Sequence, residues 1–312
     1  MRIAVVDIGT NSTRLLVADV GRARSGGPAF AELARRSTVT RLGQGVDRTG
    51  RLDPGAMERV ERVLDGYRAE ADALGAEATT GVMTSAVREA ANGAEFVRRV
   101  RGRHGFAVRA IPGEEEARLT YRGAIDGRAG DDGRVVVIDV GGGSTEVVVG
   151  SGERVAFHVS TPAGVVRLSE RHLRGDPPSA AELSALEADV SSILDATLPA
   201  DVRDAAGQAI GVAGTATSLA SIDQALEPYD PARVDGYEVT LAACERILGR
   251  LARMTEERRR AVPGLHPDRA PTILAGAVIL PAVVRAFGLD RFEASESDIL
   301  RGEALRYAAA SS

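Results

Sequence analysis

VVDIGTNSTRLLV at residues 5–17 and VIDVGGGSTEVVV at residues 137–149 are two copies of one local pattern in this chain of 312 residues. Each copy is a short apolar strand that ends in an acid, a turn of glycine and hydroxyl residues, and a second apolar strand. The copies lie about 130 residues apart, and a repeat at such a distance indicates duplicated structural units. We therefore predict two similar α/β domains that present equivalent loops to one cleft.

Strands and helices alternate along the rest of the chain. Asp53 followed by Pro54 is typical of a helix start, with the acid as N-cap and the proline in the first turn. Pro112 and Gly113 open another helix, whose first turn carries acids that the helix dipole favours. The predicted strands lie at residues 2–6, 15–20, 78–83, 107–111, 134–139, 146–149 and 208–212. The predicted helices lie at residues 54–74, 85–103 with a break at 92–93, 163–172 and 179–198, and in an alanine-rich tail.

A polar, glycine-rich linker at residues 127–133 precedes the second copy of the repeat. We predict an N-terminal domain at residues 1–122 and a C-terminal domain at residues 123–296. A C-terminal helix at about residues 297–312 is expected to pack back on the N-terminal domain. Because strands alternate with helices throughout, the predicted fold class is α/β with mixed sheets, and not a helical bundle or a β-sandwich.

Composition excludes several kinds of chemistry. All 39 lysine-plus-arginine residues are arginine. The absence of lysine removes Schiff-base and PLP chemistry, a catalytic lysine base and a Walker-type phosphate loop. The single cysteine, Cys244, cannot form an internal disulfide, and the four histidines lie too far apart in sequence for a histidine-built metal site. The net charge of −5 argues against a nucleic-acid partner.

The apolar segments are too short for membrane insertion. The first one reaches Asp7 after a few residues, which is not typical of a signal peptide. The stretch at residues 273–284 is interrupted by Gly276 and Pro281 and is too short to span a bilayer. We therefore expect a cytoplasmic protein without a membrane partner and with a reduced thiol.

In each copy of the repeat, glycine and hydroxyl residues follow the acid. Backbone N–H groups in such a turn can converge on a phosphate, the hydroxyls add donors, and the glycines allow close approach. A single loop of this kind is more often an ordinary hairpin. Two matched copies favour phosphate binding. The predicted phosphate-binding residues are Gly9, Thr10, Asn11 and Ser12 in the first loop and Gly141, Gly142, Gly143, Ser144 and Thr145 in the second.

Acids beside these loops predict a cation. A carboxylate next to a phosphate is repulsive unless a cation lies between them, so Asp7, Asp139 and Glu146 indicate a hard metal ion held through oxygen ligands. We predict Mg²⁺ or Mn²⁺. The alternative is that one of these acids only caps backbone N–H groups.

Two arginine-rich segments stand out against the acidic average. Residues 22–51 contain seven arginines and two acids, and residues 96–113 contain five arginines and no acid. They are read either as solvated surface or as a basic wall that faces a polyanion.

Eight short motifs follow one another along the chain. They are DIGTNSTRLLV at 7–17, RLGQG at 41–45, TSAVREAAN at 84–92, PGEEEARL at 112–119, DVGGGSTE at 139–146, GVVRLSE at 164–170, GVAGTATSLA at 211–220 and LAGAVIL at 274–280. In this order they resemble the motifs of the exopolyphosphatase and guanosine pentaphosphate phosphohydrolase family from end to end. The resemblance implies an actin-like, ribonuclease-H-like fold of two domains that flank an interdomain cleft, which agrees with the repeat.

The resemblance also implies roles for single residues. Glu115 in PGEEEARL would be the catalytic base that activates water, and Arg88 would contact the phosphates. Its neighbours Glu114 and Glu116 leave the register of the base open. Asp298 departs from the glycine that many members carry. Arg14, Arg41 and Arg167 fall in family-like motifs but are read equally well as salt-bridge or surface residues, and the segment 211–220 is read as structural.

These observations predict an exopolyphosphatase that uses Mg²⁺ to release terminal phosphate from inorganic polyphosphate, with short chains preferred. The first alternative is a hydrolase of guanosine pentaphosphate, which the low aromatic content of 4% makes less favoured. The second is a sensor that binds phosphate polymers without turnover, and the third is a kinase. A homodimer is expected from the family resemblance alone.

Overall fold

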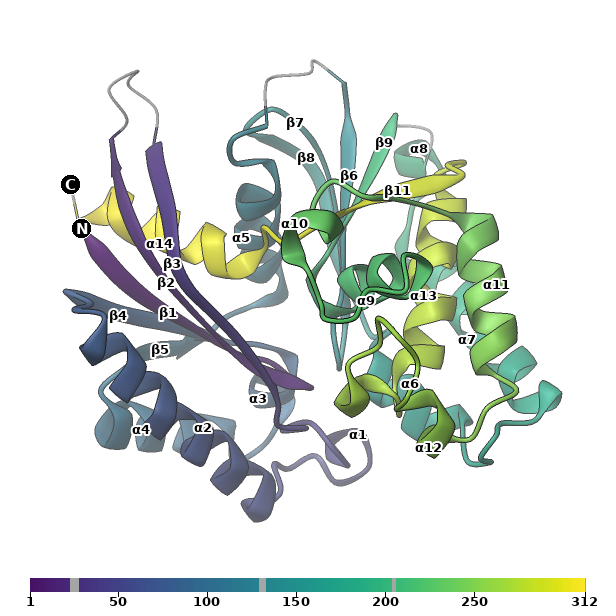
Figure 1. The fold of residues 1–312 in the computed structure, drawn as a ribbon, viewed down its shortest axis with the longest axis horizontal. Helices are drawn as coiled ribbons and strands as arrows, with labels where there is room; N and C mark the ends of the chain where they lie inside the picture. Colours follow the sequence, from purple (N-terminus) through teal and green to yellow (C-terminus); the bar gives the residue numbers. More distant parts are fainter. Residues whose placement is uncertain (23–27, 129–132, 204–205, 312) are drawn as a thin grey trace. The chain divides into compact units, whose positions relative to one another are not determined.

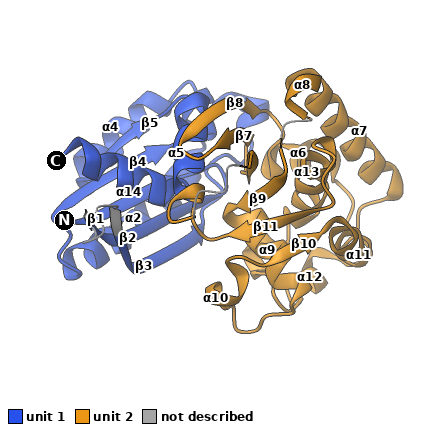
Figure 2. Ribbon diagram, turned by 90° about the horizontal axis from the view of Figure 1, so that it is seen from above, with its two compact units in different colours: residues 1–123, 298–312 blue, residues 124–297 orange. Residues whose placement is uncertain are grey.

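A computed structural model describes residues 1–22, 28–128, 133–203 and 206–311. Within the predicted linker, residues 129–132 lie outside the described part, as does Arg24 of the first arginine-rich segment. The chain divides into two compact units, coloured separately in Figure 2. Unit 1 contains Met1–Gly123 and Asp298–Ser312, and unit 2 contains Ala124–Ser297.

Unit 1 is built on a mixed sheet of five strands in the order β3-β2-β1-β4-β5. The first three strands form an antiparallel meander, and β4 and β5 run parallel to β1. The hairpin predicted around residues 5–17 is the pair β1–β2. The strands are β1 (Arg2–Ile8), β2 (Ser12–Arg22), β3 (Pro28–Val39), β4 (Ala78–Met83) and β5 (Ala107–Ala110).

Helices cover both faces of this sheet. In Figure 1, α2 and α4 lie on one side of the strands and α14 on the other. The predicted start of α2 is confirmed, because the side chain of Asp53 accepts a hydrogen bond from the Ala56 N–H. The predicted break at residues 92–93 separates α3 from α4. The helices are α1 (Val46–Thr49), α2 (Pro54–Ala73), α3 (Ser85–Glu89), α4 (Gly93–His104), α5 (Gly113–Ile125, which ends in unit 2) and α14 (Ile299–Ala310).

Strand alternation decides which way Asp7 faces. Val6 and Ile8 belong to the core on the α2 and α4 side, whereas Ile3 and Val5 pack with residues of α14. Since successive side chains of a strand point to opposite faces, Asp7 lies on the α14 side.

Unit 2 repeats the arrangement and adds one strand at its edge. Its sheet has the order β10-β11-β9-β6-β7-β8, in which β6, β7 and β8 form the antiparallel meander and β9 and β11 run parallel to β6. This shared order is the ribonuclease-H-like one, and the predicted α/β class with two mixed sheets is confirmed. The strands are β6 (Val135–Val140), β7 (Thr145–Ser151), β8 (Arg154–Thr161), β9 (Gln208–Val212), β10 (Glu238–Thr240) and β11 (Arg291–Ser295).

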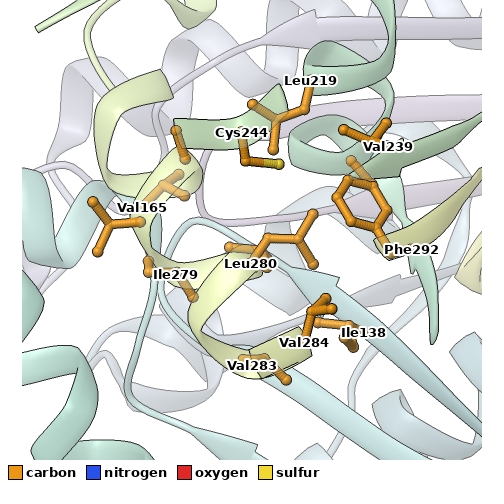
Figure 3. Packing of buried hydrophobic residues seen from close by; sticks show 14 of the residues in the cluster. Ile138, Val165, Leu219, Val239, Cys244, Ile279, Leu280, Val283, Val284 and Phe292 are labelled. Atoms are coloured by element: carbon orange, nitrogen blue, oxygen red, sulfur yellow. The ribbon is translucent and has the colours of Figure 1, made fainter. Parts of the chain in front are cut away.

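The core of unit 2 is organised around α13. This helix is apolar on all sides, and its residues Ile279, Leu280 and Val284 pack with Cys244 and Phe292 (Figure 3). Burial raises the pKa of the Cys244 thiol to about 12. The helices of unit 2 are α6 (Val165–His172), α7 (Ala180–Thr197), α8 (Ala200–Arg203), α9 (Ala213–Asp223), α10 (Pro231–Val234), α11 (Leu241–Leu251), α12 (Glu256–Arg259) and α13 (Ile273–Ala286), with a 3₁₀ turn at Pro267–Arg269.

Among the described residues, no helix combines the length and the apolar character that a membrane crossing requires. The apolar stretch at residues 273–284 is therefore the buried part of α13.

Candidate active site

The two glycine and hydroxyl loops are closed by the same hydrogen bond. In unit 1 the N–H of Gly9 donates to the carbonyl of Ser12 at 2.9 Å, and in unit 2 the N–H of Gly141 donates to the carbonyl of Ser144 at 2.9 Å. Each loop therefore joins its two strands as a hairpin of equal length.

In unit 1 the segment after β3 covers the loop. The N–H groups of Thr40 and Arg41 donate to the carbonyl of Asn11 at 2.9 and 2.8 Å, and the N–H of Gly43 donates to the carbonyl of Thr10 at 2.8 Å. The approach is close, because a Cβ atom on Gly43 would lie 2.1 Å from the methyl carbon of Thr10. Arg41, which the sequence placed in a family-like motif, holds the loop through its backbone.

In unit 2 the start of α6 covers the second loop and binds its carbonyls. The N–H groups of Val165 and Val166 donate to the carbonyls of Gly141 and Gly142 at 2.9 and 2.8 Å. A Cβ atom on Gly164 would lie 2.3 Å from the backbone carbon of Gly143, so only glycine fits here.

The side chain of Arg167 adds a third bond to the second loop. Its Nε donates to the carbonyl of Gly143 at 2.9 Å. The loop carbonyls thus accept hydrogen bonds from neighbouring donors, while several N–H groups of the loops donate to no acceptor among the described residues. These N–H groups belong to Thr10 and Asn11 in unit 1 and to Gly142, Gly143 and Ser144 in unit 2. Such unpaired N–H groups are what a phosphate needs.

Two of the predicted hydroxyl donors have structural partners. The Thr10 hydroxyl is hydrogen-bonded to that of Ser85 at 2.9 Å and accepts from the N–H of Ala86 at 3.2 Å. The Thr145 hydroxyl donates to the carbonyl of Ala163. Their contribution to a phosphate site is therefore to fix the loops.

The acids at the strand ends have different partners in the two units. In the register of β1 and β2, Asp7 lies opposite Arg14. In the register of β6 and β7, Asp139 lies opposite Glu146. Directly opposed residues of antiparallel strands point to the same face. The first pair joins opposite charges, and the second joins like charges.

Asp7 is held by Arg14. The Nε and Nη2 atoms of Arg14 donate to Oδ2 of Asp7 at 2.9 and 2.7 Å, and Nη1 of Arg14 donates to Asp298. Oδ1 of Asp7 is buried without a hydrogen-bond partner among the described residues. Burial raises the pKa of Asp7, and the ion pair with Arg14 opposes this shift.

Asp139 and Glu146 are both buried, with 8% and 1% of their surface exposed. Ser160 on β8 lies opposite Glu146, and its hydroxyl donates to Oε1 of Glu146 at 2.7 Å. Within the described ranges no three residues among His, Cys, Asp and Glu come together in a way that could hold a metal ion. A cation at this pair of carboxylates would need water or substrate oxygens to complete its shell.

The three consecutive glutamates of α5 separate into different surroundings. Glu114 pairs with Arg118 on the surface of the helix. Glu116 is buried and accepts from Nη1 of Arg88 at 2.8 Å. The side chain of Glu115 keeps 36% of its surface exposed and pairs with Arg109. Each of the three glutamates pairs with an arginine, and Glu115 is the one whose exposure lies between that of the solvated Glu114 and the buried Glu116.

Arg88 keeps part of its guanidinium for another ligand. Its Nη1 donates to the Ile111 carbonyl at 3.0 Å as well as to Glu116. Its Nε and Nη2 have no partner among the described residues, and a quarter of the side chain is exposed. These two nitrogens form the edge of the guanidinium that can grip a phosphate.

The segment 211–220 packs within unit 2. The hydroxyl of Thr215 donates to the carbonyl of Val140 at 2.9 Å. Arg269 donates to the carbonyl of Gly214 and to the hydroxyl of Ser218. Its polar groups therefore connect α9 to β6 and to the turn before α13.

Sequence reasoning missed Arg109, Glu303 and Ser160. Arg109 and Glu303 are 194 residues apart and form an ion pair, and Ser160 is matched to Glu146 only by strand register. When the two repeats are aligned, Arg14 and Glu146 occupy equivalent positions. This alignment is the signal in the sequence that could have shown that Asp7 faces a basic residue and Asp139 an acidic one.

The sequence profile of the Ppx/GppA phosphatase family matches residues 16–302. The chain belongs to the Ppx/GppA phosphatase family. This Ppx/GppA chain is 39% identical to exopolyphosphatase 2 of Mycobacterium tuberculosis, in an alignment that covers 98% of each chain. It is 31% identical to exopolyphosphatase 1 of Mycobacterium bovis over 98% of its own length and 88% of the relative.

Solved structures of Ppx/GppA proteins superpose over the whole chain. The family member from Aquifex aeolicus has a TM-score of 0.81 at 31% identity and covers 100% of this chain and 98% of its own. An exopolyphosphatase-like protein has a TM-score of 0.89 at 32% identity and covers both chains completely. The protein is therefore an enzyme of this phosphatase family and a homologue of exopolyphosphatases, as the sequence motifs predicted.

Proposed function

We propose that this Ppx/GppA protein is an exopolyphosphatase that releases terminal phosphate from inorganic polyphosphate. The observation that carries the proposal is the matched pair of loops, in each of which carbonyls are occupied while several N–H groups have no partner among the described residues. A string of phosphates offers oxygens at regular intervals and no base or ring to recognise. Repeated N–H donors suit such a ligand better than they suit a single small substrate.

In the proposed complex, Gly9–Ser12 and Gly141–Thr145 bind phosphate groups through backbone N–H donors. Arg88 contacts oxygens of the phosphoryl group that is transferred, using Nε and Nη2. Arginine suits this task because its planar donors can make two parallel hydrogen bonds to one phosphate.

The pair Asp139 and Glu146 would hold Mg²⁺ or Mn²⁺. The residues fit such an ion, since both donors are hard oxygens and the strand register places them opposite each other on one face of the sheet. When bound, the cation would neutralise charge on the phosphate oxygens. Asp7 as a further metal ligand stays a prediction. Its Oδ1 has no hydrogen-bond partner among the described residues and is available to bind a cation.

Glu115 is the proposed general base. Its carboxylate accepts a proton from a water molecule whose oxygen attacks the terminal phosphorus. The bond from that phosphorus to the bridging oxygen breaks, and the bridging oxygen stays with the shortened chain. Arg109 holds the carboxylate without removing it from solvent, because 36% of the Glu115 side chain remains exposed.

The test compares Glu115→Gln with Glu114→Gln, its neighbour on the solvated face of α5. Phosphate release from polyphosphate is measured with Mg²⁺ present. We expect Glu115→Gln to lose activity by about 100-fold or more, the range for loss of a general base, and to keep polyphosphate binding. Glu114→Gln should remain active. Full activity in Glu115→Gln, or equal losses in both variants, would contradict the role of Glu115.

The same assay separates the other hypotheses. Guanosine pentaphosphate and ATP are supplied in parallel with polyphosphates of several lengths. Faster release from guanosine pentaphosphate would favour the nucleotide hydrolase, and binding without release from any substrate would favour the sensor. Preference for short chains and a homodimer stay predictions.

A further inference from the structure

We infer that Glu303, on the C-terminal helix α14, is a positioning residue that acts on Glu115 through Arg109. The inference rests on the proposed function, in which Glu115 is the general base. It assigns to α14 an indirect part in the chemistry, through the contact of Arg109 with Glu115.

Glu303 is fully buried and makes several hydrogen bonds. Its carboxylate accepts from the Thr80 hydroxyl at 2.8 Å and from Nη1 and Nη2 of Arg109 at 2.9 and 3.1 Å. It also accepts from Nε and Nη2 of Arg306 at 2.7 and 2.9 Å. Burial alone would raise the pKa of Glu303, but the hydrogen bonds from Arg306, Arg109 and Thr80 leave it lowered. The carboxylate is thus a fixed, charged anchor.

Arg109 connects this anchor to the proposed base. The Nη2 atom that contacts Glu303 also donates to Oε1 of Glu115. A guanidinium is rigid and planar, so fixing one edge on a buried carboxylate fixes the direction in which the remaining donors point. The Glu115 side chain has several rotatable bonds and is exposed on one side, and Arg109 is the partner that restricts it.

A second residue of α14 also holds an arginine that contacts a predicted site residue. Asp298, the N-cap of α14, pairs with Arg14, which in turn holds Asp7. The same helix therefore supplies the anion behind each of two arginines that contact predicted site residues. Displacement of the helix would be expected to disturb both.

Unit 1 contains a matched control for a purely structural role. Glu61 is also buried, with 2% of its surface exposed, and it pairs with Arg99 and Arg103. Neither arginine contacts a predicted site residue in any described interaction. Replacing Glu61 by Gln removes the same charge from a similar double ion pair, and its effect on activity measures what lost stability alone does.

The experiment measures kcat, KM and the unfolding temperature of Glu303→Gln and Glu61→Gln, with polyphosphate as substrate. We expect Glu303→Gln to lower kcat by about 10-fold or more while KM changes by less than about threefold, as for loss of a supporting contact behind a catalytic group. Glu61→Gln should keep kcat within about twofold of the parent even if it unfolds at a lower temperature. Glu303→Asp, which keeps the charge and is the milder change, should show an intermediate loss.

A double-mutant cycle shows whether Glu303 acts through Glu115. In the Glu115→Gln background, Glu303→Gln should leave the residual rate unchanged, because the group it positions is gone. An equal fractional loss in both backgrounds would overturn the inference. So would a kcat for Glu303→Gln and Glu303→Asp that matches that of Glu61→Gln. Full activity of Glu115→Gln alone would instead refute the role of Glu115 as general base, whereas no phosphate release by the parent protein would refute the proposed function.

Discussion

The hairpin of unit 1 and the hairpin of unit 2 have the same backbone and opposite electrostatics. Both have an aspartate at the end of the first strand and a closing hydrogen bond across the loop, and in both a following segment binds the loop carbonyls. In unit 1 the residue opposite the aspartate is Arg14, and in unit 2 it is Glu146. One position of the repeat thus gives the aspartate a basic residue opposite it in unit 1 and an acidic residue opposite it in unit 2.

The difference separates the proposed roles of the two loops, which share backbone donors for phosphate but have different side chains beside the aspartate. Asp7 and Arg14 belong to a row of alternating charges that continues through Asp298 to Arg35. Asp139 and Glu146 lie opposite each other and offer hard oxygen donors on one face of the sheet, which suits a cation. We therefore place the proposed cation at the second hairpin.

The largest expected effect comes from copying the charge of unit 1 into unit 2. Glu146→Arg would give Asp139 the partner that Asp7 has. We expect phosphate release to fall by about 100-fold or more at every Mg²⁺ concentration, since the arginine takes the place of the cation. A magnesium titration of activity checks this. Glu153→Arg, an exposed change in the β7–β8 turn, is the control, and equal activity in both variants would contradict the proposal.

The next largest effect is expected where a glycine packs closely against each loop. Gly164→Ala places a Cβ atom 2.3 Å from backbone, whereas Gly43→Ala places one 2.1 Å from the Thr10 methyl, which can move. We expect about a 10-fold loss of kcat/KM for Gly164→Ala and a smaller loss for Gly43→Ala, because a misplaced loop loses its phosphate geometry. Gly249→Ala, which meets nothing within 4 Å, should be neutral or stabilising. A larger loss in Gly43→Ala would reverse the proposed ranking.

The pH dependence of stability tests the buried acid of unit 1. The folded state holds a proton on Asp7 more tightly than the unfolded state does, because burial raises its pKa above 3.8. Stability from this group is complete below that pH and is lost as the pH rises through the raised pKa. Compared with Asp7→Asn, the parent should therefore lose about 1.4 kcal/mol for each unit of pKa difference. Urea unfolding of both proteins from pH 4 to pH 8 measures this, and parallel curves would contradict it.

The smallest expected effect uses a pair of serines at equivalent positions. Ser160 lies opposite Glu146, and Ser37 lies opposite Arg14. The Ser160 hydroxyl bonds to Glu146, so Ser160→Ala should raise the Mg²⁺ concentration for half-maximal activity by about threefold, which corresponds to the low end of the roughly 0.5–1.5 kcal/mol that a typical hydrogen bond contributes. Ser37→Ala should not change it. Equal magnesium curves for Ser160→Ala and the parent would show that this hydroxyl does not tune the site.

Much of the fold could be predicted because its signals are local. Both first hairpins combine apolar strands with turn residues, and Asp53 with Pro54 marks the start of α2. Strands β3 and β8 were missed. They lie at sheet edges with one side partly open to solvent, so polar residues and arginines interrupt the apolar alternation. The short strands β10 and β11 were missed as well, since three and five residues carry little pattern.

The residues of the candidate site also divide into those that local motifs predict and those that only the fold brings together. Residues inside ordered motifs, such as Glu115 and Arg88, could be named from sequence. Glu303 could not, because its partner Arg109 lies 194 residues away and only the folded sheet brings them together. The identity of the residue opposite each strand-end aspartate also required the strand register.

Binding of Mn²⁺ followed by electron paramagnetic resonance shows which of the two hairpins holds the proposed cation. The parent, Asp139→Asn and Asp7→Asn are titrated without substrate, and the Asp7–Arg14 pair serves as the internal comparison. We expect Asp139→Asn to weaken Mn²⁺ binding by about 10-fold or more and Asp7→Asn to change it by less than about threefold. Unchanged binding in Asp139→Asn, or an equal loss in Asp7→Asn, would contradict this placement of the cation.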